Sequence, residues 1–177
     1  IPQPGRGPLK VVEFKNVFKN YLELEVYKDL NLLVQRGQKI GLVGKNGSGK
    51  STLLKMLAKV ENATSGNIIF GSDINIHYFN QHHIESFDME STIYDNILFK
   101  SDGWSETKIR TYLGSFLFSG DIVKNKIKVL SGGEKARLAL AILLVKPAHL
   151  ILLDEPTNHL DIFSRNIIEV AFKYYNG

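Results

Sequence analysis

The sequence predicts an α/β protein with a parallel core sheet, and three observations support that prediction. Short apolar runs typical of strands alternate with stretches in which apolar residues recur at helical spacing. A glycine-rich loop at 44–49 stands between a predicted strand and a predicted helix. The continuous apolar run Leu150–Leu153 is typical of a central strand of a parallel sheet, which is buried on both faces.

The composition is that of a globular domain. The chain has 177 residues, of which 44% are hydrophobic and 23% charged, and this excludes disorder over the whole length. Cysteine is absent, which excludes a disulfide framework and a cysteine nucleophile; a zero count fits a reducing compartment without establishing one. We expect a cytoplasmic protein. The net charge of +4 permits an anionic partner without requiring one. No apolar run approaches the roughly 18–20 residues that cross a bilayer, so we expect no direct membrane insertion.

The first half of the chain is predicted to be mostly strands. Proline and glycine dominate its start, which indicates a linker at residues 1–9 before a domain at 10–177. We expect strands at Lys10–Phe14, Leu22–Val26 and Lys39–Val43, a helix at Lys50–Lys59, and a hairpin of Gly66–Phe70 with Ile74–Phe79.

From about residue 92 the apolar period becomes helical. One stripe of a helix that starts near Ser105 is predicted to contain Ile109, Tyr112, Leu113, Phe116 and Leu117, with Trp104 packing beside it. A helix at Lys135–Val145 is apolar after its first turn and should be buried on all sides. A final amphipathic helix is predicted at Ile162–Tyr175, with Phe163, Ile167, Val170, Phe172 and Tyr174 apolar.

The loop Gly44–Ser51 fits the pattern G-x-x-x-x-G-K-[ST]. Glycines let backbone N–H groups turn inward around phosphate oxygens, and the following helix directs its positive end at the same oxygens. Lys50 is then expected to reach the β- and γ-phosphates, and the Ser51 hydroxyl to bind Mg²⁺. The simpler alternative is a flexible glycine turn before a helix. We predict that ATP is bound by Gly44, Lys45, Asn46, Gly47, Ser48, Gly49, Lys50, Ser51 and Thr52.

Two acidic residues follow the apolar run Leu150–Leu153. Ligands of open α/β sheets bind at the carboxyl ends of the strands. We therefore predict that Asp154 holds Mg²⁺, directly or through a water molecule, and that Glu155 polarises the attacking water. Taken alone, the pair could also be a solvated turn.

A second anion-binding segment opens a later helix. Leu130 is followed by Ser131, Gly132, Gly133 and Glu134. A serine and two glycines at a helix N-terminus can bind an anion, and one nucleotide seldom needs two anion-binding sites of this kind. The sequence LSGGE resembles the signature motif of ATP-binding cassette (ABC) domains. The phosphate loop, Gln81, this motif and the acidic pair occur in that family's order, so the resemblance covers about residues 10–175.

The resemblance implies a P-loop NTPase cassette with a mainly parallel core sheet, an N-terminal antiparallel β subdomain and a small helical subdomain at about 88–135. It also implies a second cassette as partner, with two ATP molecules between the two cassettes. Gln81 resembles the family's glutamine that senses Mg²⁺ and water, and Tyr21 resembles the aromatic residue that stacks on adenine, although Tyr21 could simply be a strand-edge core residue. Asn158 and Asp161 match the loop at the dimer interface.

Several segments look like the ABC-F subfamily, whose soluble twin-cassette ATPases act on ribosomes, some of them protecting against antibiotics. These segments are 110–120, 133–137 and 155–161. The interval between Gln81 and Ser131 leaves no room for the helical arm of a first cassette, so we expect the second cassette, ending before its switch histidine. The alternatives are a nucleotide-binding subunit of a membrane transporter and a non-hydrolysing ATP-binding module.

Other polar segments have simpler explanations. Lys124, Lys126 and Lys128 could contact ribosomal RNA, but a solvated edge is the plainer interpretation. His82, His83 and Glu85 are expected to form a solvated loop rather than a metal site.

Overall fold

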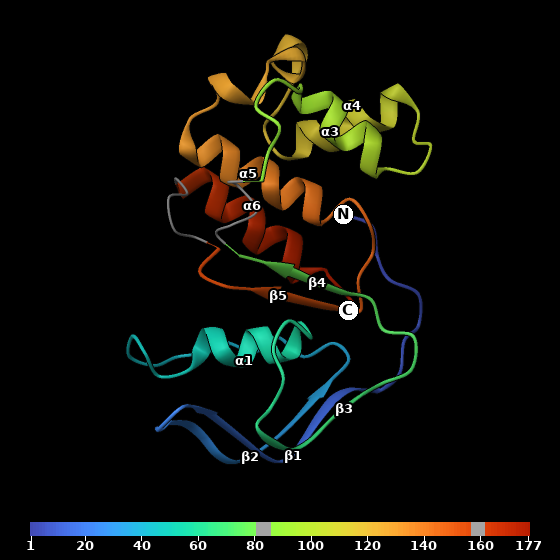
Figure 1. Ribbon diagram of the computed structural model, residues 1–177. Helices are drawn as coiled ribbons and strands as arrows, with labels where there is room; N and C mark the ends of the chain where they lie inside the picture. Colours follow the sequence, from blue (N-terminus) through green and yellow to red (C-terminus); the bar gives the residue numbers. More distant parts are fainter. Residues whose placement is uncertain (81–85, 157–161) are drawn as a thin grey trace. The chain divides into compact units, whose positions relative to one another are not determined.

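A computed structural model describes residues 1–80, 86–156 and 162–177, and in the last helix only some of the side chains (Figure 1). The chain divides into two compact units. We call them the β-rich unit, made of Pro4–Tyr78, Ala148–Asp154 and Asn176–Gly177, and the helical unit, made of Ile1–Gln3, Phe79–Pro147 and Glu155–Tyr175.

An antiparallel sheet forms one side of the β-rich unit. It consists of β1 (Lys10–Tyr21), β2 (Leu24–Gln35) and β3 (Ser65–Phe70) in the order β2-β1-β3. The predicted strands at 10–14 and 22–26 are thus real but much longer, and Leu22 lies in the turn between β1 and β2 at φ 52°. The N-terminal antiparallel β structure implied by the resemblance is confirmed.

Gly66 allows β3 to lie close to β1. Its φ is 86°, a left-handed value that favours glycine. A Cβ atom at this position would lie 2.2 Å from the backbone oxygen of Asn16, far inside contact distance. Gly66 is therefore required for two reasons: its φ value favours glycine, and the close approach of the β1 backbone leaves no space for a side chain.

The core of the β-rich unit lies between the sheet and helix α1 (Lys50–Leu57). Leu53, Leu54, Met56 and Leu57 are buried on one side of the helix and pack with Val12, Val17 and other β1 side chains. Two further strands, β4 (Ile76–Phe79) and β5 (Leu150–Leu153), pair with each other in a parallel sheet (Figure 1). The prediction of a strand at 150–153 is confirmed.

Two predictions for the β-rich unit are wrong. Residues 66–70 and 74–79 do not form a hairpin, because β3 pairs with β1 and β4 pairs with β5. Residues 39–43 do not form a strand: no strand of the described chain pairs with them, and Val43 is 98% exposed. Alternating apolar residues indicate that a segment can be a strand, but the strand itself depends on a partner that is distant in the sequence.

The helical unit contains four helices and two short 3₁₀ turns within the described residues. They are α3 (Ile93–Lys100), α4 (Glu106–Ser115), η1 (Gly120–Lys124), η2 (Ile127–Val129), α5 (Gly132–Leu143) and α6 (Ile162–Lys173). Thr92 caps α3 by accepting the Asp95 N–H at 3.1 Å, and Ser105 caps α4, where a helix start was predicted.

Helix α5 forms the centre of this unit. All residues from Ala136 to Ala141 are buried, as predicted, whereas Ile142 and Leu143 are only partly buried and the helix ends before the predicted Val145. The Tyr112 hydroxyl of α4 donates a hydrogen bond of 2.7 Å to the Ala141 carbonyl. Trp104 packs edge-on against the Tyr112 ring, with the ring centres 5.1 Å apart. The predicted packing role of Trp104 is thus confirmed.

The ends of two predicted apolar stripes differ from the prediction. Helix α4 ends at Ser115, so Leu117 takes φ 61° and is half exposed instead of extending the stripe. In α6, Val170 is 60% exposed and Tyr174 follows the helix end at 68% exposed, whereas Tyr175 is buried. Helical spacing locates the faces of a helix but does not locate its last residue.

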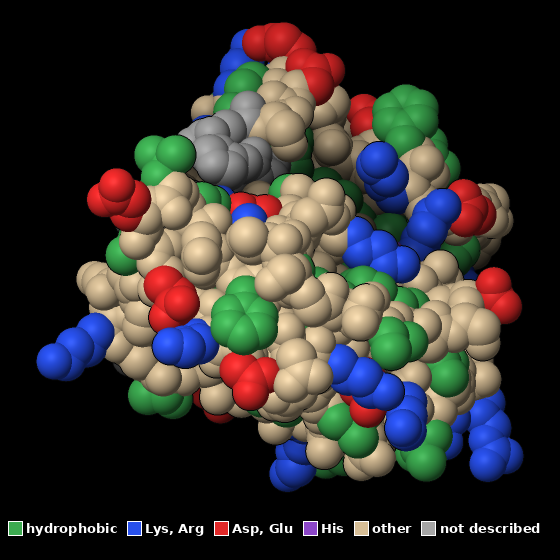
Figure 2. All heavy atoms as spheres, turned by 60° about the horizontal axis from the view of Figure 1, so that its bottom comes forward, with side chains coloured by type: hydrophobic (Ala, Val, Ile, Leu, Met, Phe, Trp, Pro, Cys, Tyr) green, Lys and Arg blue, Asp and Glu red, His purple; other side chains and the backbone are tan. Residues whose placement is uncertain are grey.

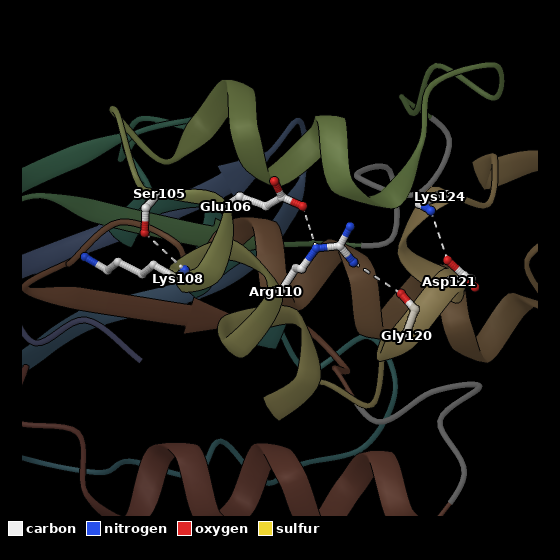
Figure 3. Close-up of polar contacts among 7 residues, drawn as sticks. All are labelled: Ser105, Glu106, Lys108, Arg110, Gly120, Asp121 and Lys124. Carbon is white, nitrogen blue, oxygen red and sulfur yellow. Dashed lines mark hydrogen bonds and ion pairs between the residues drawn. The ribbon is translucent and has the colours of Figure 1, made fainter.

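One side-chain hydrogen bond joins α4 to the start of η1, and further polar contacts lie within α4 and within η1 (Figure 3). Arg110 donates one hydrogen bond from Nε to Glu106 at 2.8 Å and another from a terminal nitrogen to the Gly120 carbonyl at 3.4 Å. The segment 110–120 is therefore closed by a contact between its first and last residues. Lys124 pairs with Asp121 within the following turn.

The alternating lysines before the second glycine motif have carboxylate partners. Glu90 accepts hydrogen bonds from Lys126 at 2.8 Å and from Lys128 at 2.7 Å. These two bonds lower the pKa of Glu90 to about 2. Each lysine of the run thus faces an acidic residue of this chain, which favours the solvated-edge interpretation.

Charged side chains of both signs are mixed on one face of the molecule. On the face drawn in Figure 2, basic side chains lie in several separate places with acidic and hydrophobic side chains between them. The net charge of +4 is thus not gathered into one patch on that face. Among the described helices, none is both long and apolar enough to span a membrane.

Candidate functional site

The loop before α1 is shaped by two glycines. Gly47 and Gly49 have φ values of 80° and 92°, which turn the backbone in a way that other residues rarely adopt. Gly49 is the N-cap of α1 and offers no side chain to accept the first N–H groups of the helix. These donors therefore remain available to an anion at the helix N-terminus.

Lys50 lies folded back along this loop. Its Nζ atom donates hydrogen bonds to the Gly44 carbonyl at 2.8 Å and to the Lys45 carbonyl at 2.9 Å. The ammonium group is thus held at the loop by two neutral acceptors. A phosphate oxygen is a stronger acceptor for an ammonium group than a carbonyl, so Lys50 is placed to change partners when phosphate binds.

Ser51 and Asp154 meet although they come from different ends of the chain. The Ser51 hydroxyl donates to Asp154 Oδ1 at 3.2 Å, and Tyr78 donates from its hydroxyl to Oδ2 of the same carboxylate at 3.3 Å. Mg²⁺ prefers oxygen ligands and is often held by one carboxylate, a hydroxyl and substrate phosphates. A hydroxyl and a carboxylate oxygen at this separation fit that ligand set.

Tyr27 contacts the phosphate loop from β2. Its hydroxyl donates to the Gly49 carbonyl at 3.1 Å, and its half-buried ring packs against the core of the β-rich unit. Burial raises the pKa of Tyr27, so its hydroxyl stays protonated as a donor at neutral pH.

Tyr21 ends β1 and is 40% exposed. The Lys19 ammonium lies 4.7 Å from the centre of its ring and pairs with Glu61 at 2.7 Å. Hydrogen bonds from Lys19 and then from Tyr21 lower the pKa of Glu61. The Lys19–Glu61 ion pair, in which Lys19 is buried and Glu61 partly exposed, thus lies against one side of the Tyr21 ring.

Glu155 follows Asp154 at the end of β5. Its φ is 51°, a left-handed value that turns the chain sharply after the strand, and its side chain is exposed. The carboxylates of Asp154 and Glu155 therefore belong to consecutive residues with different backbone conformations.

The second glycine motif begins α5 with a reciprocal cap. Ser131 accepts the Glu134 N–H at 3.3 Å, and Glu134 accepts the Ser131 N–H at 2.8 Å. The Ser131 N–H and, at 2.7 Å, the Ser131 hydroxyl both donate to the Glu134 carboxylate, and these two bonds lower the pKa of Glu134. A Cβ atom on Gly132 would meet nothing within 4 Å, so no contact within the described chain explains the glycine.

Three predicted site residues lie outside the described residues, namely Gln81, Asn158 and Asp161. The histidines at 82 and 83 and Glu85 also lie outside them. The structure places Lys50 and Ser51 at the start of α1 with Asp154 in contact with Ser51, and it adds Tyr27 and Tyr78, which sequence analysis missed. Both tyrosines lie in strands, and only the folded arrangement reveals that Tyr27 reaches the loop and Tyr78 reaches Asp154.

A glycine loop that opens a helix, with a hydroxyl and a strand-end carboxylate beside it, defines a P-loop nucleotide-binding protein. The sequence profile described as "ABC transporter" matches residues 27–158. The chain therefore belongs to the ABC transporter family, as one of its ATPase domains.

Curated relatives of the chain include members of the ABC-F group. ABC transporter F family member 5 of Arabidopsis thaliana is 38% identical over 178 residues, which are 100% of this chain and 26% of that protein. The ATP-binding protein YdiF of Bacillus subtilis is 41% identical over 175 residues, 99% of this chain and 27% of that protein. Protein GCN20 of Saccharomyces cerevisiae is 36% identical over 178 residues, 100% of this chain and 24% of that protein. The chain thus spans about a quarter of the length of these relatives.

Solved structures confirm the predicted fold class. A metal-chelate type ABC transporter in an inward-facing conformation matches with a TM-score of 0.71 and 23% identity, covering 96% of this chain and 71% of that one. A bacterial Atm1-family ABC exporter with ATP bound matches with a TM-score of 0.76 and 25% identity, covering 97% of this chain and 33% of that one. The predicted ABC cassette is confirmed, and so is its resemblance to ABC-F proteins.

Proposed function

We propose that the chain is the ATP-binding and hydrolysing cassette of a soluble, cytoplasmic ABC-F protein that acts on the ribosome. The observation that carries the ATPase part is the cluster of Lys50, Ser51 and Asp154 at the loop before α1. The subfamily part is supported by relatives of the ABC-F group that are 36% to 38% identical over the whole chain.

In this proposal the loop from Gly44 to Thr52 binds the phosphates of ATP, and Lys50 moves from the two loop carbonyls to the β- and γ-phosphates. Ser51, Asp154 and Gln81 hold Mg²⁺, which neutralises charge that develops on the phosphates during hydrolysis. Tyr78 keeps the Asp154 carboxylate oriented toward Ser51 by occupying its other oxygen.

Glu155 and Gln81 are proposed to position and polarise the attacking water, because a carboxylate that follows the metal-binding residue can accept a proton from water. Tyr21, which is 40% exposed, is proposed to stack on adenine with the ring face opposite Lys19. The cassette proper covers 10–177 after a linker at 1–9, with a helical lobe at about 88–135.

A second cassette in the same complete protein is proposed to complete the site. Ser131, Gly132, Gly133 and Glu134 would cap the ATP held by that partner, and Asn158 and Asp161 would lie at the interface. The space at Gly132 supports this arrangement, because within the described residues nothing lies within 4 Å of the position that a Cβ atom would take, which suits the close approach of a ligand.

Co-sedimentation of the complete protein with ribosomes tests the ribosomal part of the proposal. The variant Glu155→Gln should bind ATP without hydrolysing it and remain on ribosomes in the presence of ATP, whereas Lys50→Ala should not. Ribosomes should also raise the ATPase rate of the unaltered protein. An ATPase rate that responds to a membrane-embedded partner and not to ribosomes would favour the alternative, a transporter subunit.

Protein synthesis in vitro separates the two ribosomal roles. If the protein is a translation factor, adding it should change protein synthesis without antibiotic. If it protects against antibiotics, it should restore inhibited synthesis.

A further inference from the structure

The Gly49 carbonyl has two donors in the β-rich unit. One is the Leu53 N–H at 2.9 Å, the first hydrogen bond of α1, and the other is the Tyr27 hydroxyl at 3.1 Å. The first bond directs the carbonyl along the helix axis. The second fixes it against β2, a strand that contains none of the predicted phosphate ligands.

The orientation of this carbonyl also sets the orientation of a donor. In a planar trans peptide the C=O and N–H groups point in opposite directions. With the Gly49 carbonyl held toward α1 and Tyr27, the N–H of Lys50 points out of the helix N-terminus. That N–H is one of the helix donors without an acceptor inside the helix, and it faces the place where a phosphate would bind.

The backbone around Gly49 would otherwise be loosely held. Gly49 takes φ 92° and has no side chain to cap the helix. A Cβ atom there would lie 2.7 Å from Val26 Cγ1 and 3.0 Å from the Tyr27 oxygen, so the two β2 side chains occupy the space behind the loop. Val26 restricts this space by contact alone, whereas Tyr27 adds a directional hydrogen bond.

We propose that Tyr27 is a positioning residue for phosphate binding, which acts by holding the Gly49–Lys50 peptide in the orientation that presents the Lys50 N–H to the nucleotide. The inference rests on the proposed role of the loop in binding nucleotide phosphates. In this proposal a residue of β2 contributes to the affinity for ATP and for ADP, because both nucleotides place phosphates in the loop.

The test uses the complete protein with Tyr27→Phe, which keeps the ring and removes the hydroxyl. Loss of one neutral hydrogen bond should raise the dissociation constants of Mg-ATP and Mg-ADP about three- to tenfold. The Michaelis constant for Mg-ATP should rise by more than kcat falls, because the contact acts on bound phosphate before the reaction. Site-specific occupancy can be read from photolabelling with 8-azido-ATP and mapping of the labelled peptides of this chain.

The matched control is Tyr112→Phe, which also removes a hydroxyl that donates to a backbone carbonyl, but in the helical unit. It should lower thermal stability without changing either dissociation constant. Amide hydrogen exchange of the peptide spanning 44–53 gives a second measurement that needs no ligand: exchange should increase in Tyr27→Phe and not in Tyr112→Phe.

Unchanged affinity and unchanged exchange in a folded Tyr27→Phe protein would overturn the inference, as would an equal effect of Tyr112→Phe. Lys50→Ala separates this result from failure of the proposed function. If Lys50→Ala abolishes labelling and Tyr27→Phe has no effect, the loop binds nucleotide and only the role of Tyr27 is wrong. If Lys50→Ala has no effect, the proposed nucleotide site is itself wrong.

Discussion

The hydroxyl of Ser51 lies 3.2 Å from a carboxylate oxygen of Asp154, a residue 103 positions further along the chain. The first residue lies in the first turn of α1 and the second at the end of β5. Their meeting depends on the packing of α1 against β5 in the β-rich unit. The candidate Mg²⁺ ligands are therefore fixed by tertiary structure, although each belongs to a recognisable local motif.

Lys50→Ala and Glu155→Gln should separate binding from reaction. Loss of the ammonium group removes a charge-assisted contact to phosphate and should weaken Mg-ATP binding at least about tenfold. Glu155→Gln should retain affinity within a few-fold and abolish turnover, because its carboxylate acts on water. Equilibrium binding and steady-state ATPase assays on the complete protein check this, and an equal loss of affinity in both variants would contradict it.

The reciprocal cap of α5 should contribute to stability. Ser131→Ala removes the acceptor for the Glu134 N–H and leaves the Glu134 carboxylate without its partner hydroxyl. We expect a loss of about 1 kcal/mol in the free energy of unfolding of the helical unit. Ser105→Ala at the simple cap of α4 is the comparison, and it should cost less in the same chemical denaturation experiment.

Two glycine substitutions should have opposite effects. Gly66→Ala would place a Cβ atom 2.2 Å from a backbone oxygen and at φ 86°, so it should destabilise the β-rich unit by several kcal/mol or prevent folding. Gly114→Ala lies inside α4 with nothing within 4 Å of the new atom, and it should stabilise by about 0.5–1 kcal/mol. Thermal unfolding of both variants against the unaltered protein gives the signs directly.

The lowered pKa of Glu90 should make the free energy of unfolding depend on pH. Its pKa in the folded protein is about 2, below the ordinary value of 4.5, because Lys126 and Lys128 donate to its carboxylate. Its contribution is therefore complete above about pH 4.5 and is lost as the pH falls through 2. Glu90→Gln should narrow the stability difference between pH 5 and pH 2, and high salt should reduce the effect because the pairs are exposed. An identical pH profile in the variant would exclude this role for Glu90.

Local patterns predicted the parts of the fold that depend on neighbouring residues. The phosphate loop, the helix start near Ser105 and the buried helix around Leu138 follow from turn chemistry, helix-start preferences and apolar spacing, each of which acts within a few residues. The pairing of β3 with β1 and the absence of a strand at 39–43 could not be predicted, because strand partners are chosen across long sequence intervals.

The same reasoning applies to the candidate site. Sequence analysis predicted Lys50, Ser51 and Asp154 because each belongs to a motif of consecutive residues. Tyr27 and Tyr78 were missed because their roles depend on strand register, which brings each hydroxyl to a loop or carboxylate of another segment. A tyrosine in a strand has no sequence signal that separates a packing residue from a hydrogen-bond donor at a site.

The contact of Trp104 with Tyr112 gives this chain a built-in optical reporter. Trp104 is the single tryptophan of the sequence, and it lies in the helical unit. Tryptophan emission of the chain therefore follows the packing of the helical unit around α4, while far-ultraviolet circular dichroism follows both units. If the two signals have different unfolding midpoints, the units melt separately; if they coincide, the whole chain unfolds as one cooperative system.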